Sequence, residues 1–271
     1  MASFTHVLET LLPEPHAGLL AGLLFGVKAS VPKELYDALV KTGTLHIIAL
    51  SGMNISILSG MMQASMTPLV GRRVASLGTL LLIVVFVWFV GPSPSIVRAA
   101  IMGGLSLIAV LFGRQYWALY TWGFAGVCMM LSHPAWIGDI SFQLSMLATL
   151  GIIVFGKSNV HSISGSELLS WKEKIRDIVR DDLHITLAAQ IFTVPVIFWY
   201  FHRVSLISPL ANILIGWVIA PLTGLGWMTI CVSFVWRPLG YVCAWVCWVA
   251  LEYIVRTVYI VSELPWASIG I

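Results

Sequence analysis

Charged residues are scarce in this sequence: Asp, Glu, Lys and Arg together make up 10% of its 271 residues. A soluble domain carries about 25% charged residues, because polar groups must cover its surface. Apolar residues instead make up 59% of the chain, and the mean hydropathy is +0.93. This composition excludes a soluble globular domain, a disordered chain and a coiled coil. It predicts an integral membrane protein that crosses the bilayer several times.

Cysteine is also scarce, and so are the motifs of metal and nucleotide sites. The four cysteines, at positions 128, 231, 243 and 247, all lie inside apolar runs without further soft ligands nearby. We therefore interpret them as packing residues. The chain contains no HxHxD, HExxH, P-loop or GxGxxG segment, and we expect no metal and no cofactor.

The first 17 residues lack the positive region of a signal peptide. They contain Glu9 and Glu14 but no Lys or Arg. A cleaved signal peptide begins with such a positive region. The first long hydrophobic segment is therefore expected to act as an uncleaved insertion signal.

Runs without charge predict where the chain crosses the bilayer, because a crossing helix needs about 20 apolar residues. We expect an all-α polytopic fold in a single domain over residues 1–271, with about eight transmembrane helices. Their predicted spans are roughly 43–64, 74–91, 96–113, 116–133, 139–156, 183–201, 206–236 and 239–261. In the seventh span, Pro209, Pro221 and three glycines favour either a helix broken beside a wet pathway or a bent packing helix.

Two segments outside these spans predict interfacial helices. Residues 17–41 are read as a helical hairpin at the membrane interface, with close packing along the small residues Gly18, Gly22 and Gly26. In that hairpin Leu35, Leu39 and Val40 are expected to face lipid while the charged residues stay in water. Residues 157–182 form the hydrophilic loop, and apolar residues at three- and four-residue spacing predict an amphipathic helix within it.

Lys and Arg counts in alternate loops predict the orientation. Nine basic residues fall on the side that holds the loops after the first, third, fifth and seventh spans, and six fall on the other side. The side with nine is therefore predicted to be cytoplasmic. Eight spans then place both termini outside, in a multi-pass protein of the cytoplasmic membrane. The side with six includes Lys28, Lys33 and Lys41, which pull against this assignment.

Polar residues recur along one stripe of four predicted spans, which is the pattern of a bundle around a polar interior. In the first span, a kink at Ser51-Gly52 would turn His46 toward the stripe. The stripes are Thr44, Ser51 and Asn54 in the first span; Thr186, Gln190 and Thr193 in the sixth; and Ser205, Ser208 and Asn212 in the seventh. In the fifth span, Asp139 and Gln143 lie four residues apart, and Ser141, Ser145 and Thr149 form a second stripe.

Two arginines, Arg98 and Arg203, lie close to predicted span ends. One interpretation is that each side chain extends to lipid head groups. The other is that each is a cation at an entrance used by an anion, for which phosphate oxygens are natural ligands. The residues alone leave both interpretations open.

Catalytic interpretations are weaker. A dyad of Ser51 and His46 fails because a five-residue offset on a straight helix keeps the base out of reach of the hydroxyl. Asp139 would need a second buried carboxylate, and nothing in the sequence ties Glu252 to it. We therefore expect a protein that is not an enzyme.

Four segments together resemble the ComEC family, the inner-membrane DNA channel of natural competence. They are HIIALSGMN at 46–54, PSPSIVRAAIM at 92–102, FQLSMLATLGI at 142–152 and FHRVSLISPLAN at 201–212. Their order and spacing match over nearly the whole chain, from about residue 18 to 266.

The resemblance implies a membrane channel subunit that passes single-stranded DNA across the cytoplasmic membrane while the other strand is degraded outside. It implies that the conduit or its framework includes His46, Ser51, Gly52, Asn54, Arg98, Gln143, Ser145, Ser205 and Asn212, with Arg98 steering phosphates. The polar stripe of the sixth span adds Gln190, and the charge argument adds Arg203. Many members have His where this chain has Asn54.

Family members commonly carry an outer OB-like domain before this region and a nuclease-like domain after it, and this sequence includes neither. We expect strand degradation by a separate nuclease, together with a DNA receptor and a cytoplasmic ATP-driven helicase motor as partners. Whether the pore is one chain or a homodimer is left open. The alternatives are a polytopic permease for a small solute, and then an intramembrane enzyme.

Overall fold

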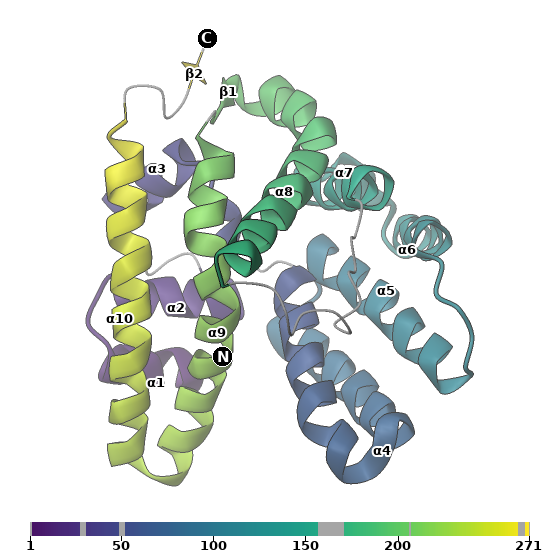
Figure 1. The fold of residues 1–271 in the computed structure, drawn as a ribbon, viewed down its shortest axis with the longest axis horizontal. Coiled ribbons are helices and arrows are strands. Elements are labelled where there is room, and N and C mark those ends of the chain that lie inside the picture. Colours follow the sequence, from purple (N-terminus) through teal and green to yellow (C-terminus); the bar gives the residue numbers. More distant parts are fainter. Residues whose placement is uncertain are drawn as a thin grey trace.

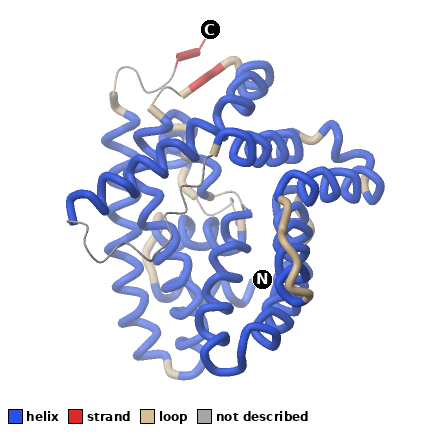
Figure 2. The backbone as a smooth tube through the Cα atoms, turned by 45° about the vertical axis from the view of Figure 1, so that its right-hand side comes forward, coloured by secondary structure: helices blue, strands red, loops and turns tan. Residues whose placement is uncertain are grey.

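The computed structural model describes residues 2–27, 31–48, 52–156, 171–205, 207–264 and 269–270. These residues are mostly helical, and they also include one pair of two-residue strands (Figures 1 and 2). The elements are α1 (Ala2–Leu11), α2 (His16–Phe25), α3 (Lys33–Lys41), the 3-10 turn η1 (Leu45–Ile47), α4 (Gly52–Val90), α5 (Pro94–Leu111), α6 (Ala118–Ser132), η2 (Pro134–Gly138), α7 (Ile140–Phe155), α8 (Trp171–Phe201), β1 (Arg203–Val204), α9 (Ser208–Val235), α10 (Arg237–Ser262) and β2 (Ile269–Gly270).

The helix α4 is a hairpin of two limbs, 52–70 and 72–90, because the backbone turns at Gly71. Gly71 has φ 79° and ψ 163°, a conformation that interrupts the helix. The limbs then pack side by side: the Gln63 amide nitrogen donates to the Thr79 hydroxyl at 3.1 Å and lies 3.4 Å from the Ser76 hydroxyl. The break coincides with Arg72 and Arg73, which separate the first two predicted spans.

Within the described residues, five helices are long and apolar enough to cross a membrane: α4, α5, the 183–201 part of α8, α9 and α10. Many of their large apolar side chains are exposed, including Trp88 at 84% and Val235 at 89%. Surfaces of that kind suit lipid rather than water. The prediction of an all-α polytopic membrane protein is confirmed.

The helices α6 and α7 differ from the predicted spans 116–133 and 139–156. They have 15 and 16 residues, which is short for a crossing helix. Figure 1 views both nearly end-on, so they run across the direction of α9 and α10.

The apolar core is divided into separate clusters. The largest joins α1, α2, α3 and η1 to α9 and α10, with Leu20, Ile215 and Leu251 fully buried. A second cluster lies between α4 and α5, and a third between α6 and α7. The molecule therefore consists of a bundle around α9 and α10 and a set of helical hairpins, α4 to α8, that packs against this bundle (Figure 1).

Aromatic rings connect these two parts. Phe4 of α1 contacts Phe89 of α4 and Phe234 of α9, each with ring centroids 5.3 Å apart. Trp227 of α9 lies 5.5 Å from Phe25 and 6.1 Å from Phe86. Edge-to-face contacts of this kind add to the apolar area that the rings bury.

The hairpin expected at 17–41 forms two helices, but its surroundings differ from the prediction. Every residue of α2 is buried in protein, and Gly22 packs directly against Ile48. Leu35 and Leu39 are also fully buried, while Val40 is 38% exposed. The prediction that Leu35 and Leu39 face lipid is wrong, because α10 and the bundle core cover that face of α3.

Two further predictions change at α8 and α9. The amphipathic segment expected within 157–182 is helical from Trp171 and continues without a break into the span as far as Phe201; residues 157–170 lie outside the described part. In α9 the helix is continuous from Ser208 to Val235 although Pro221 lies inside it. Half of its most apolar window is buried, so the packing-helix interpretation of this segment is the one the structure supports.

Candidate functional site

Arg98 lies where three helices begin. Its Nη1 donates to the Ser145 carbonyl of α7 at 3.1 Å. On the other side is Gly52, the first residue of α4, where an added Cβ would lie 2.8 Å from the Arg98 Nη2. One turn earlier, the Ser95 hydroxyl of α5 lies 3.3 Å from the Ser141 hydroxyl of α7. We call these five residues the Arg98 junction.

The Arg98 junction carries positive charge that is only partly offset. No carboxylate of the described residues forms an ion pair with Arg98, and its buried Nε has no hydrogen-bond partner among them. The N-terminal ends of α4, α5 and α7 add the positive ends of their helix dipoles. Asp139 offsets one of these by capping α7, accepting from the backbone N–H of Ser141 at 2.7 Å and of Phe142 at 3.2 Å. The junction thus favours an anion.

Asn54 connects α4 to the bundle. Its side chain is 3% exposed, and its amide donates to the Leu23 carbonyl at 2.5 Å. That carbonyl is one of the last four of α2, which have no partner within their own helix. Asn54 therefore ties the start of α4 to the end of α2, while its buried Oδ1 has no hydrogen-bond partner in the described part of the chain.

His46 lies in η1, apart from the helix that the sequence predicts for it. Its ring is exposed, and Nδ1 lies 3.1 Å from the Gly43 carbonyl. Partial desolvation lowers the pKa of His46, and the hydrogen bond to Gly43 opposes this.

Gln190 and Ser208 form the contact between α8 and α9. The Gln190 amide donates to the Ser208 hydroxyl at 2.7 Å. Ser208 and Ser205 also lie beside Gly43, so the start of α9 meets the turn after α3. One residue from the predicted stripe of the sixth span, Gln190, therefore contacts one from that of the seventh, Ser208.

The other described residues that the sequence predicts for the site lie in α7, α9 and β1. Gln143 lies at the start of α7 and donates to the Ile137 carbonyl at 2.9 Å, which joins α7 to η2. Asn212 is half-buried in the second turn of α9. Arg203 belongs to β1, where it pairs with Gly270 of β2. Ser51 lies outside the described residues.

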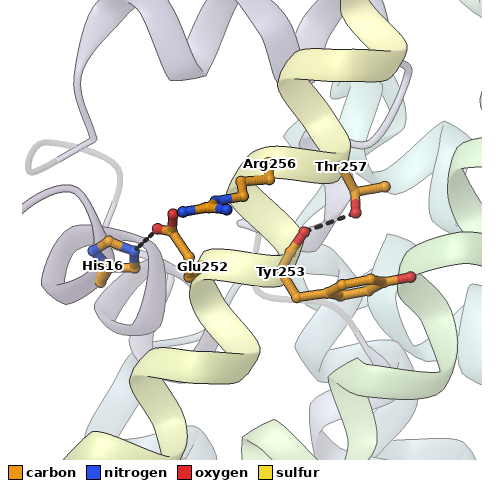
Figure 3. A network of polar contacts seen from close by, with 5 residues as sticks. All are labelled: His16, Glu252, Tyr253, Arg256 and Thr257. Carbon is orange, nitrogen blue, oxygen red and sulfur yellow. Dashed lines mark hydrogen bonds and ion pairs between the residues drawn. The ribbon is translucent and has the colours of Figure 1, made fainter.

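The sequence reasoning missed a second charged cluster, formed by His16, Glu252 and Arg256 (Figure 3). The Glu252 carboxylate lies 2.8 Å from the His16 Nε2 and 2.5 Å from the Arg256 Nε. His16 is buried against Trp248, whereas Arg256 is largely exposed. The cluster ties α2 to the middle of α10. The spacing of four residues between Glu252 and Arg256 was the available signal.

The described residues contain no group of three His, Cys, Asp or Glu side chains arranged to hold a metal ion. Cys243 and Cys247 are free thiols, and the buried Cys247 Sγ lies 3.4 Å from the Thr229 hydroxyl. The polar residues described above are instead contacts between helices. They can hold the parts of the molecule in register and present one cation to an anionic ligand.

A family model described as "Competence protein" matches residues 23–271 of the chain. The chain belongs to the competence protein family. The resemblance to the ComEC family is therefore confirmed, and the Arg98 junction lies inside the region that the competence protein model covers. That region also includes Asn54, Gln190 and Ser208.

Two curated relatives match this chain over part of their own length. ComE operon protein 3 of Bacillus subtilis (strain 168) is 28% identical over 213 residues, which are 78% of this chain and 25% of that protein. The uncharacterized protein YcaI of Escherichia coli (strain K12) is 26% identical over 214 residues, which are 76% of this chain and 28% of that protein. The chain thus spans about a quarter of the length of these competence protein relatives. No solved structure matches the chain.

Proposed function

We propose that this chain is a subunit of the channel that passes single-stranded DNA across the cytoplasmic membrane during natural competence. Membership of the competence protein family and the similarity to ComE operon protein 3 support a role in DNA uptake. The apolar helices supply the membrane-crossing part.

The observation that carries the proposal is the unpaired charge of Arg98. A guanidinium at membrane depth costs free energy unless a partner or a polar cavity compensates it. Its Nη1 reaches the Ser145 carbonyl, its buried Nε has no partner in the described part of the chain, and no carboxylate there neutralises it. A phosphate passing the Arg98 junction would supply the missing acceptor and the missing charge.

The predicted orientation places this junction where a strand would enter. The connection before α5 is one that the Lys and Arg counts assign to the outside, and the same counts assign both termini to that side. A single cation attracts phosphates without reading bases and without binding so tightly that the strand is retained. This matches a conduit that must accept any sequence and release it.

The proposal assigns the other steps to partners. A receptor delivers duplex DNA, a separate nuclease degrades one strand, and an ATP-driven helicase in the cytoplasm pulls the other. The lipid bilayer surrounds the apolar helices, and a second copy of the chain completes the pore if one copy encloses too little space.

The test is DNA uptake in a strain in which the gene is replaced by variants. Labelled duplex DNA is supplied, and surface-bound DNA, cytosolic single strands and transformants are counted. We expect Arg98→Ala to reduce cytosolic strands by about tenfold or more, because a hydrogen bond to a charged group contributes roughly 1.5–3 kcal/mol. Arg98→Lys keeps the charge and should retain part of the uptake.

Arg237→Ala is the matched control, because Arg237 is an exposed arginine at the start of α10, remote in sequence from the junction. It should leave uptake unchanged, and all variants should reach the membrane in equal amounts. Unchanged uptake in Arg98→Ala, or in a deletion of the gene in a competent strain, would contradict the proposal and favour a solute permease.

A further inference from the structure

A cavity of about 280 Å³ lies between the second half of α5 and the start of α6. Its wall is apolar and includes Leu105, Ile108, Ala109 and Phe112 of α5. Arg114 and Trp117 of the connection line it as well. Gln115, Tyr116 and Thr121 complete the lining. The cavity therefore suits an amphipathic ligand, with its hydrocarbon against α5 and its polar end beside the connection.

The connection between the helices, residues 112–117, shows at which depth of the bilayer the cavity lies. Among the hydrogen bonds of the described chain, the backbone N–H groups of Gln115, Tyr116 and Trp117 donate none. Irregular backbone of this kind does not occur exposed in the hydrocarbon. Trp117 is 61% exposed and Tyr120 is 71% exposed, and such rings concentrate at the membrane–water interface. The connection therefore lies at the level of the lipid head groups.

Arg114 gives this interfacial cavity its charge. The side chain is exposed, and no carboxylate of the described residues pairs with it. Its backbone is fixed by the hydrogen bond from its N–H to the Ala109 carbonyl at 2.9 Å. A cation thus stands at head-group level beside an apolar cavity.

We propose that this cavity binds an anionic glycerophospholipid, with the lipid phosphate at Arg114 and the first part of one acyl chain against Ile108, Ala109 and Phe112. The phosphate meets the guanidinium in a charge-assisted hydrogen bond, and the acyl chain removes the apolar wall from water. None of the five residues of the Arg98 junction lines this cavity, and the proposal does not depend on DNA passage.

The test measures lipid retained by the purified full chain. The protein is incubated with phosphatidylglycerol or phosphatidylcholine, and bound lipid is counted by native mass spectrometry. We expect the wild-type chain to retain phosphatidylglycerol in preference to phosphatidylcholine. Arg114→Gln should lower the retained phosphatidylglycerol about tenfold. Ala109→Trp should lower it too, because the indole fills the cavity while Arg114 is kept.

The matched control is Arg237→Gln, since Arg237 is also an exposed arginine beside an exposed tryptophan but does not line this cavity. It should retain phosphatidylglycerol like the wild type. Arg114→Gln alters one exposed side chain, so its melting temperature should match the wild type. Equal retention in Arg114→Gln, or displacement of the lipid by a short thymidine oligonucleotide, would overturn the proposal, the second because it would identify a nucleic-acid site.

Discussion

Gly52 lies directly against the Arg98 guanidinium. The guanidinium can occupy this position because glycine has no side chain. An added Cβ at position 52 would lie 2.8 Å from the Arg98 Nη2 and 2.9 Å from the Ala99 Cβ. These distances are too short for a van der Waals contact, so either the α4 start or the guanidinium must move. A glycine at this position is therefore part of how Arg98 is held.

Gly52→Ala tests this contact. We expect the variant to lose about 1–3 kcal/mol of stability, because overpacking forces side chains and backbone to shift. Thermal unfolding in detergent measures it, and strand uptake should fall with it. Gly60→Ala is the control in the same helix, since no atom lies within 4 Å of its added Cβ. Equal melting temperatures for the two variants would contradict the packing described here.

Glu252 compensates two other polar side chains, one of which is buried. We expect Glu252→Gln to lower stability by about 1–3 kcal/mol, because His16 and Arg256 then lose their charged acceptor. The measurement is again thermal unfolding of the purified chain. Glu263→Gln, one residue after the end of α10, removes a carboxylate of the same charge outside the cluster and should leave the melting temperature unchanged.

At the scale of elements, the bend at Gly71 decides that α4 forms a hairpin. Its φ of 79° and ψ of 163° lie in a region that is open almost only to glycine, and a side chain there costs about 1–3 kcal/mol. The contact of Gln63 with Thr79 across the hairpin depends on this turn. Without it, the first two spans would form one overlong helix.

Gly71→Ala should therefore lower the melting temperature. Gly78→Ala in the second limb is the matched control, because an added Cβ there meets only the Met66 and Met62 side chains, at 3.5 and 3.6 Å. Alanine also favours the helix over glycine by about 0.5–1 kcal/mol, so this control should be equally stable or more stable. A Gly71→Ala variant as stable as the Gly78→Ala variant would contradict the bend.

At the scale of the whole molecule, parts with separate apolar cores meet through aromatic rings and through a few polar contacts. Asn54 joins α4 to α2, Arg98 joins α5 to α7, and Gln190 joins α8 to α9. Each contact compensates a polar group at or near a helix end. These three contacts therefore hold the parts in register.

The orientation of the whole molecule is tested by labelling single cysteines after the four native cysteines are replaced. Positions Arg73 and Arg237 are predicted to face the cytoplasm, because they belong to the loops richer in Lys and Arg. Cysteines there should react with an impermeant reagent only after the cells are permeabilised. A cysteine at Pro92, which is exposed in the structure, should react in intact cells. The reverse pattern would invert the predicted topology.

The sequence alone determined the membrane class, the helical fold, the break between the first two spans and the family. Composition and charge-free runs suffice for these, because each helix satisfies its own backbone hydrogen bonds and only its length and polarity need to suit lipid. The polar stripes were also visible, because residues three and four apart share a helix face.

Only the tertiary structure decided what those stripes contact. Asn54 is buried against the Leu23 carbonyl and His46 stands in a separate turn, although both were assigned to one site. Leu35 and Leu39 are covered by protein because the bundle packs against α3, which no local pattern distinguishes from a lipid-facing surface. Glu252 meets His16 across 236 positions of the chain. Such contacts depend on how helices are placed in space, because the hydrophobic pattern of one helix does not specify which neighbour covers it.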